Sequence, residues 1–142
     1  MMDLILWRHA HARDLVEGEE DIQRPLTPRG EIEADGLRVL ASPAVRTEQT
    51  VKALNRKYKL RAELLPDGLP QDLLELAQWP SAQGTVLVVG HQPMLGQVAA
   101  QLLGMQASEC AIRKGSVWWL RQRQRLDATE TVLLTVQSPE FL

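Results

Sequence analysis

An uninterrupted apolar run at residues 86–89, Val-Leu-Val-Val, constrains the fold more than any other feature of this sequence. A strand that is apolar on both faces fits the centre of a parallel sheet covered by helices on both sides. Apolar runs at residues 4–7 and 39–41 predict two further buried strands. Residues 117–120 and 131–136 predict two late strands, antiparallel and nearer an edge. The chain is therefore expected to build a sheet layered with helices.

Four helical patterns alternate with these strands, beginning near Thr27 and covering residues 43–58, 70–79 and 94–103. Ser42 is expected to cap the second helix, with Pro43 at its first position. A short strand is expected within residues 61–65. The alternation of strands and helices predicts a three-layer α/β/α sandwich with a mostly parallel central sheet and helices on both faces. Residues 1–142 are expected to form one domain.

Composition narrows the classes of protein to which the chain can belong. A formal net charge of −2 argues against a nucleic-acid-binding protein, since such domains usually carry a basic surplus. The N-terminus shows no signal peptide, and no apolar run is long enough to span a membrane, so a soluble cytoplasmic protein is expected. The one cysteine, Cys110, is expected to be a small buried hydrophobe rather than a nucleophile.

Charged and polar side chains follow three of the predicted strands at the point where each strand ends. Arg8 and His9 follow the first strand, Arg46 lies one turn into the helix after the second, and His91 follows residues 86–89. Because ligands of α/β sheets bind beyond the carboxyl ends of the strands, these side chains are expected to meet at one edge. Imidazoles and guanidiniums crowded together repel one another unless an anion lies between them. A phosphate-type or sulfate-type anion fits the planar fork of arginine.

Four sequence blocks carry a resemblance to a known family: Leu-Trp-Arg8-His9-Ala10, Arg24-Pro-Leu-Thr-Pro-Arg-Gly30, Ser42-Pro-Ala-Val-Arg46-Thr-Glu-Gln-Thr50 and Gly90-His91-Gln-Pro. In this order they resemble the histidine phosphatase superfamily, also called phosphoglycerate mutase-like. Within it they look most like the small bacterial phosphohistidine phosphatase branch typified by SixA. The first block departs from the family's Arg-His-Gly motif, because Ala10 stands in place of glycine.

The resemblance implies a metal-independent phosphatase that needs no cofactor. His9 would be the nucleophile and would form a transient phosphohistidine. Arg8, Arg46 and His91 would bind the phosphoryl oxygens and neutralise charge in the transition state. Asp67 is the candidate acid for the leaving group, because it lies in Pro-Asp-Gly-Leu where relatives often have Pro-Glu-Leu.

Other polar residues of these blocks leave alternatives open. Ser42 and Arg24 are candidates for contacting the substrate or supporting the site, although Arg24 fits a surface position equally well. His9 and His11 are two residues apart and could be read as metal ligands. Neither has a nearby cysteine or carboxylate at ligand spacing, so no metal site is predicted.

The chain also departs from the family in length. Only six residues, 31–36, separate Gly30 from Leu37, where relatives have about 12 residues more, or roughly three helical turns. The segment near residues 31–37 is therefore expected to be shortened, or a stretch of the chain is missing from it. The helical lid that larger relatives insert is also expected to be absent, which would leave an open pocket.

These features rank three functions. An open pocket suits a protein substrate, so the leading hypothesis is removal of phosphate from phosphohistidine on a histidine-containing phosphotransfer protein in signal transduction. A small-molecule phosphomonoesterase or mutase of the same superfamily, acting on a small phosphate ester, is the second. A non-catalytic phosphoprotein-binding relative is the third, and the intact set of Arg8, His9, Arg46 and His91 argues against it.

Overall fold

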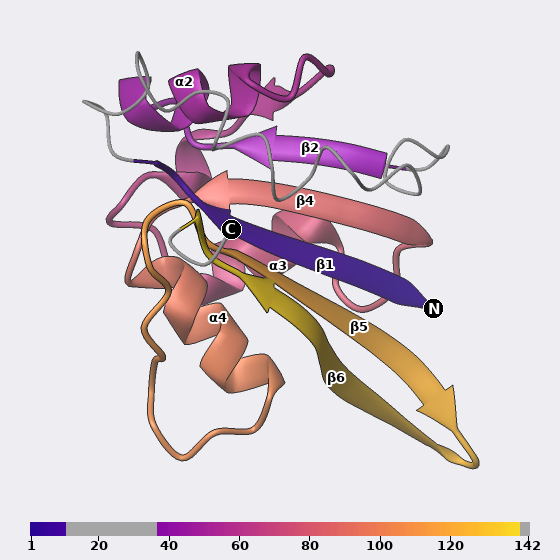
Figure 1. Cartoon of the computed structure of the whole chain (residues 1–142). Helices are drawn as coiled ribbons and strands as arrows, with labels where there is room; N and C mark the ends of the chain where they lie inside the picture. Colours follow the sequence, from indigo (N-terminus) through magenta and orange to yellow (C-terminus); the bar gives the residue numbers. More distant parts are fainter. Residues whose placement is uncertain (11–36, 140–142) are drawn as a thin grey trace.

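The computed structural model describes residues 1–10 and 37–139, and within them six strands form one mixed sheet in the order β3-β2-β4-β1-β5-β6 (Figure 1). The elements are β1 (Met2–Arg8), β2 (Leu37–Ala41), α2 (Val45–Lys52), β3 (Lys59–Leu60), the 3-10 turn η3 (Ala62–Leu64), α3 (Pro70–Ala77), β4 (Gly84–Gly90), α4 (Met94–Leu102), β5 (Val117–Arg125) and β6 (Ala128–Gln137). Strands β1 to β4 run parallel, β5 runs antiparallel to β1, and β6 runs antiparallel to β5.

Helices cover both faces of the sheet, with α2 on one side and α3 and α4 on the other (Figure 1). Successive side chains of a strand point to opposite faces, and β1 follows this rule. Leu4 and Leu6 pack in the cluster that includes α3 and α4, whereas Ile5 and Trp7 pack in the cluster that includes α2. Residues 86–89 of β4 are fully buried between β2 and β1. The predicted three-layer sandwich with a mostly parallel sheet is confirmed.

The prediction for the second helix was wrong at both ends. Helix α2 begins at Val45 rather than at Pro43, because Ser42 is still bound to the sheet: its N–H donates to the Val89 carbonyl at 3.1 Å. Ser42 therefore does not cap the helix, and Ala44 occupies the cap position without a side-chain hydrogen bond. At the other end α2 stops at Lys52, shortly before Asn55 takes a left-handed φ of 55°.

The short strand expected within residues 61–65 lies earlier in the chain. Strand β3 covers only Lys59–Leu60, which pair with Leu40 and Ala41 at the carboxyl end of β2. Beyond that pair β2 has ended, so the chain turns into η3 and buries Leu64 in the core. The helix expected near Thr27 and nearly all of the segment at residues 31–37 lie outside the described residues.

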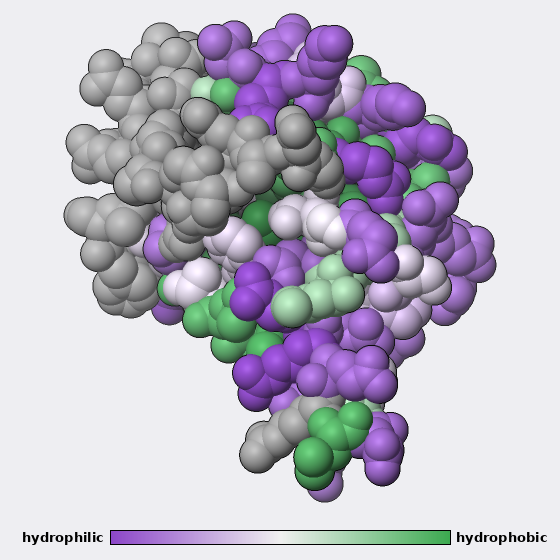
Figure 2. All heavy atoms as spheres, turned by 90° about the vertical axis from the view of Figure 1, so that its right-hand side faces the viewer, coloured by the Kyte–Doolittle hydropathy of each residue, from purple (hydrophilic) through white to green (hydrophobic). Residues whose placement is uncertain are grey.

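The late hairpin β5–β6 forms the far edge of the sheet, as predicted. The coloured part of the face shown in Figure 2 is mostly hydrophilic, and apolar side chains form small separate groups on it. In the part of the chain that the structure describes, no helix is long and apolar enough to cross a membrane.

Candidate active site

The carboxyl ends of β1, β2 and β4 bring three sequence-distant segments together. The ladder hydrogen bonds continue one residue past the strands, since the His9 N–H donates to the Gly90 carbonyl at 3.0 Å. The rings of His9 and His91 lie with their centroids 5.1 Å apart at 59°. Arg46, in the first turn of the helix α2 that follows β2, reaches His9 across the end of β4. The predicted meeting of His9, Arg46 and His91 at one sheet edge is present in the structure.

The hydrogen bonds of His9 fix which ring nitrogen carries the proton. Its Nδ1 lies 2.8 Å from the Ala10 carbonyl oxygen, which can only accept, so Nδ1 carries the hydrogen and donates it. Its Nε2 accepts from Nε of Arg46 at 3.3 Å, and a guanidinium can only donate. The Nε2 lone pair is therefore free of a proton and faces the arginine.

The surroundings of His9 favour the neutral ring. Burial is the largest cause that lowers its pKa, and the charges of Arg46, Arg8 and Lys114 lower the pKa further. The hydrogen bond to the Ala10 carbonyl acts in the opposite direction, because it stabilises the protonated form. The net result is a pKa below the ordinary 6.5, which keeps Nε2 unprotonated at neutral pH.

His91 is 2 % exposed, and it is held by hydroxyl groups rather than by a carboxylate. Its Nε2 lies 2.8 Å from Oγ of Ser42 and 3.4 Å from Oγ1 of Thr47. Burial, followed by the charges of His9, Arg46 and Arg8, lowers the pKa of His91 to about 4. Its Nδ1 is buried and has no hydrogen-bond partner among the described residues.

Arg8 presents a second buried polar atom of this kind. Its Nη1 donates to the Ile112 carbonyl at 2.7 Å, which fixes the guanidinium beside the end of β1. Its Nε is buried without a hydrogen-bond partner among the described residues. Buried polar atoms are almost always satisfied in folded proteins, so unsatisfied donors clustered with cations point to an anionic ligand.

Two residues of the site were missed by the sequence analysis. Thr50 is fully buried, and its hydroxyl accepts from the Ala10 N–H at 3.1 Å while donating to the Arg46 carbonyl at 2.9 Å. Thr47, also fully buried, contacts His91. Their positions one and four residues after Arg46 put polar groups on the inward face of α2. This spacing of polar residues after Arg46 is the sequence pattern that could have predicted Thr47 and Thr50 as residues of the site.

Other predicted residues are not joined to this cluster by any described contact. Asp67 is exposed in the turn between η3 and α3, where a Cβ added at Gly68 would meet the Glu63 carbonyl and the end of the Met94 side chain. Arg24 and His11 lie outside the described residues. Cys110 is half-buried, and burial raises the pKa of its thiol, which favours the unreactive protonated form.

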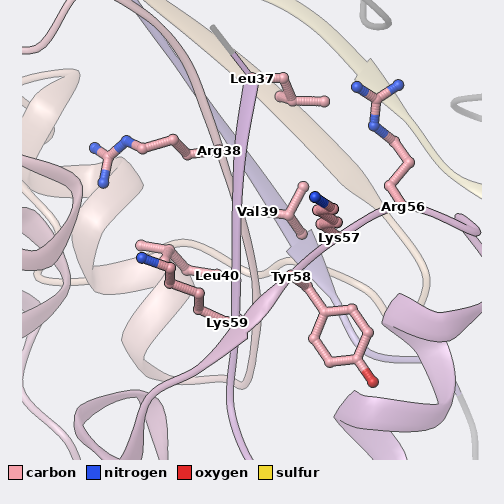
Figure 3. A pocket seen from close by; sticks show the side chains of 8 residues that line it. All are labelled: Leu37, Arg38, Val39, Leu40, Arg56, Lys57, Tyr58 and Lys59. Carbon is pink, nitrogen blue, oxygen red and sulfur yellow. The ribbon is translucent and has the colours of Figure 1, made fainter.

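A separate cavity of about 560 Å³ lies along β2 and is lined by residues 37–40 and 56–59 (Figure 3). Figure 3 shows Arg38 extending away from Tyr58, and its Nη2 donates to the Ala77 carbonyl at 2.9 Å. None of Arg8, His9, Arg46 and His91 lines this cavity. Within residues 1–10 and 37–139, no group of three or more His, Cys, Asp or Glu side chains could hold a metal ion.

Comparison with known sequences identifies one relative. The chain is 32% identical to an uncharacterized protein of Picosynechococcus sp. over 163 aligned positions, covering 99% of each chain. The chain belongs to the same family as this cyanobacterial protein. Since the alignment has 163 positions and the chain has 142 residues, at least 21 positions (163 − 142) hold residues only of the relative. No family model matches the chain.

Solved structures identify the fold. The protein histidine phosphatase SixA complexed with tungstate superposes with a TM-score of 0.72 at 21% identity and covers 99% of both chains. A phosphoserine phosphatase variant from Entamoeba histolytica with phosphoserine has a TM-score of 0.70 at 14% identity, covering 100% of both. A mycobacterial glucosyl-3-phosphoglycerate phosphatase has a TM-score of 0.66 at 13% identity, covering 94% of this chain and 97% of its own. The fold that the sequence resemblance implied is confirmed.

Proposed function

We propose that this chain is a metal-independent phosphatase that transfers the phosphoryl group of its substrate to His9 and then to water. The single observation that carries the proposal is the hydrogen bonding of His9. Nδ1 is committed to the Ala10 carbonyl, so Nε2 presents a lone pair toward Arg46, close to the ring of His91. A neutral imidazole held in one tautomer among cations is the arrangement that nucleophilic attack on phosphorus needs.

In the first step Nε2 of His9 attacks phosphorus, a P–N bond forms, and the bond from phosphorus to the leaving group breaks. Arg8, Arg46 and His91 would bind the three phosphoryl oxygens, where negative charge is spread in the transition state. The unpartnered Nε of Arg8 and Nδ1 of His91 supply positions for this binding. Ser42 would support it indirectly by holding the His91 ring. Arg24 is proposed as a further residue near the substrate.

In the second step water attacks the phosphohistidine, which releases inorganic phosphate and regenerates neutral His9. The leaving group of the first step must gain a proton. Asp67 is our candidate for the donor of that proton. Its turn packs on Met94, which begins α4 three residues after His91. The imidazole of phosphohistidine leaves more readily than an alkoxide, so the acid matters less for phosphohistidine than for an alkyl ester.

The proposed substrate is phosphohistidine on a histidine-containing phosphotransfer protein of a signalling system. The fold shared with the protein histidine phosphatase SixA supports this choice. Other proteins of the same fold, the phosphoserine and glucosyl-3-phosphoglycerate phosphatases, are named for small phosphate esters. Turnover of a phosphorylated phosphotransfer domain must therefore be compared directly with turnover of small phosphate esters.

The test is to trap the phosphoenzyme. Mixing the protein with a ³²P-labelled phosphoramidate and quenching in alkali should leave label on the protein, because phosphohistidine survives alkali and is lost in acid. His9→Ala should abolish the label and lower the steady-state rate at least about a thousandfold. His11→Ala, at the neighbouring histidine, is the matched control and should keep the label. Full labelling of His9→Ala would refute the proposal.

A further inference from the structure

The segment at residues 112–116 is tied to the main chain of the proposed nucleophile. The Gly115 N–H donates to the carbonyls of Arg8 at 3.0 Å and His9 at 3.2 Å, and the Arg8 N–H donates to the Ser116 carbonyl at 3.1 Å. Gly115 has a φ of +77°, and an added Cβ would lie 2.8 Å from Cγ of Pro139. The backbone that follows Lys114 is therefore fixed beside Arg8 and His9, and the Ile112 carbonyl that precedes it accepts from the Arg8 side chain.

A cavity of about 470 Å³ lies at this segment. It is lined by Arg8, Arg113, Lys114, Ser138 and Pro139. Three of these five side chains are cationic, and none of them is acidic. Arg8 also belongs to the proposed phosphoryl site, so the cavity and that site share this residue, whereas His9, Arg46 and His91 do not line the cavity.

Lys114 contributes a charge to this cavity that no described carboxylate compensates. Its side chain is exposed and makes no hydrogen bond or ion pair with the described residues. Its charge nevertheless acts at the nucleophile, since it is one of the causes that lower the pKa of His9. Two structural observations, the fixed backbone and the shared cavity, thus place the Lys114 ammonium group, which is unpaired among the described residues, near Arg8 of the proposed phosphoryl site.

We propose that Lys114 determines substrate specificity by binding a carboxylate that the substrate carries close to its phosphoryl group. This inference rests on the proposed phosphatase function and narrows its substrate class. With the phosphoryl group held by Arg8, the carboxylate must lie only a few bonds from phosphorus or on an adjacent residue. Such a carboxylate belongs either to an acidic side chain beside phosphohistidine in a protein or to a small phosphorylated acid.

The experiment compares matched substrate pairs that differ in one carboxylate. One pair is a phosphohistidine peptide with glutamate beside the phosphohistidine and the same peptide with glutamine there. The other pair is 3-phosphoglycerate and glycerol phosphate, which has a hydroxymethyl group in place of the carboxylate. Selectivity is the ratio of kcat/KM for the acidic member of a pair to that for its neutral member. The pair that shows the greater selectivity identifies the source of the carboxylate.

Lys114→Met keeps most of the side-chain length and removes the charge, so it should lower the selectivity about tenfold, mainly through KM. Lys114→Arg should restore most of it. Lys57→Met, at an exposed lysine of the separate cavity along β2, should leave selectivity unchanged. If Lys114→Met changes selectivity no more than Lys57→Met does, Lys114 does not bind a substrate carboxylate.

A binding measurement separates this inference from the phosphatase proposal. In the His9→Ala background no turnover is expected, and calorimetry can compare the affinities for 3-phosphoglycerate and glycerol phosphate directly. Adding Lys114→Met should remove the preference for 3-phosphoglycerate. A preference that persists contradicts the role of Lys114. Absence of phosphoenzyme in the wild-type protein, with the preference lost on adding Lys114→Met, contradicts only the catalytic proposal.

Discussion

Acid is expected to destabilise this protein through His91. The ring is 2 % exposed, and burial together with the charges of His9, Arg46 and Arg8 lowers its pKa from 6.5 to about 4. In the unfolded chain the same imidazole becomes protonated below pH 6.5. Between pH 6.5 and about 4 the unfolded state therefore binds more protons than the folded state. The free energy of unfolding keeps its full value above this interval and falls as the pH drops through it.

The size of the effect follows from the two pKa values. Each tenfold change in proton affinity corresponds to about 1.4 kcal/mol, so the interval from 6.5 to about 4 predicts a loss of about 3 kcal/mol. Urea denaturation near pH 7 and near pH 4, in buffer without phosphate, measures it. His91→Gln retains an amide that can bond to Ser42 and does not titrate. Between pH 7 and pH 4 the free energy of unfolding of the wild type should fall by about 3 kcal/mol more than that of this variant.

A shift below about 1 kcal/mol would refute the argument that burial keeps the ring neutral. His9, which also has a lowered pKa, is present in both proteins, so most of its contribution cancels in the comparison. A direct measurement keeps the prediction testable if the variant folds poorly. Titration of the His91 ring by nuclear magnetic resonance should give a midpoint near 4, and a midpoint near 6.5 would contradict the prediction.

Two further predictions concern the supports of the site and its proposed acid. Thr50→Val should lower the free energy of unfolding by about 2 kcal/mol, since it removes two hydrogen bonds and leaves the buried Ala10 N–H unpaired. Thr129→Val, at an exposed position of β6, is the control in urea denaturation. If both variants lose the same free energy of unfolding, the Thr50 hydroxyl contributes little. Asp67→Asn should slow hydrolysis of glycerol phosphate about a hundredfold and that of a phosphohistidine peptide far less. Equal slowing of both substrates would exclude Asp67 as the acid.

The sequence sufficed to predict that His9, Arg46 and His91 meet, because backbone geometry brings them together. Parallel strands that end at the same level place the residues that follow them at one edge of the sheet. The pattern of apolar runs in the sequence shows where each strand ends. His9 and His91 follow β1 and β4 directly, and Arg46 lies in the first turn of α2. Side-chain detail was not needed to bring these three together.

Ser42 was a candidate for supporting the site, but the contact through which it does so could not be predicted in the same way, because that contact depends on where α2 begins. An expected start at Pro43 made Ser42 a helix cap, whereas the start at Val45 leaves Ser42 free to hold His91. A helix start is decided by competition between local capping and the sheet ladder. Here the bond from Ser42 to Val89 prevails, and nothing in the local sequence reveals that bond.

The hydrogen bonds around Ala10 explain how the chain accommodates its departure from the Arg-His-Gly motif. Both backbone polar groups of Ala10 are hydrogen-bonded. Its N–H donates to Oγ1 of Thr50, and its carbonyl accepts from Nδ1 of His9. Neither bond involves a side chain at this position, and Ala10 is not among the described residues with positive φ. A methyl group is therefore compatible with the geometry. Helix α2 thus acts on His9 twice, through the guanidinium of Arg46 and through the chain of bonds from Thr50 to Ala10 to His9.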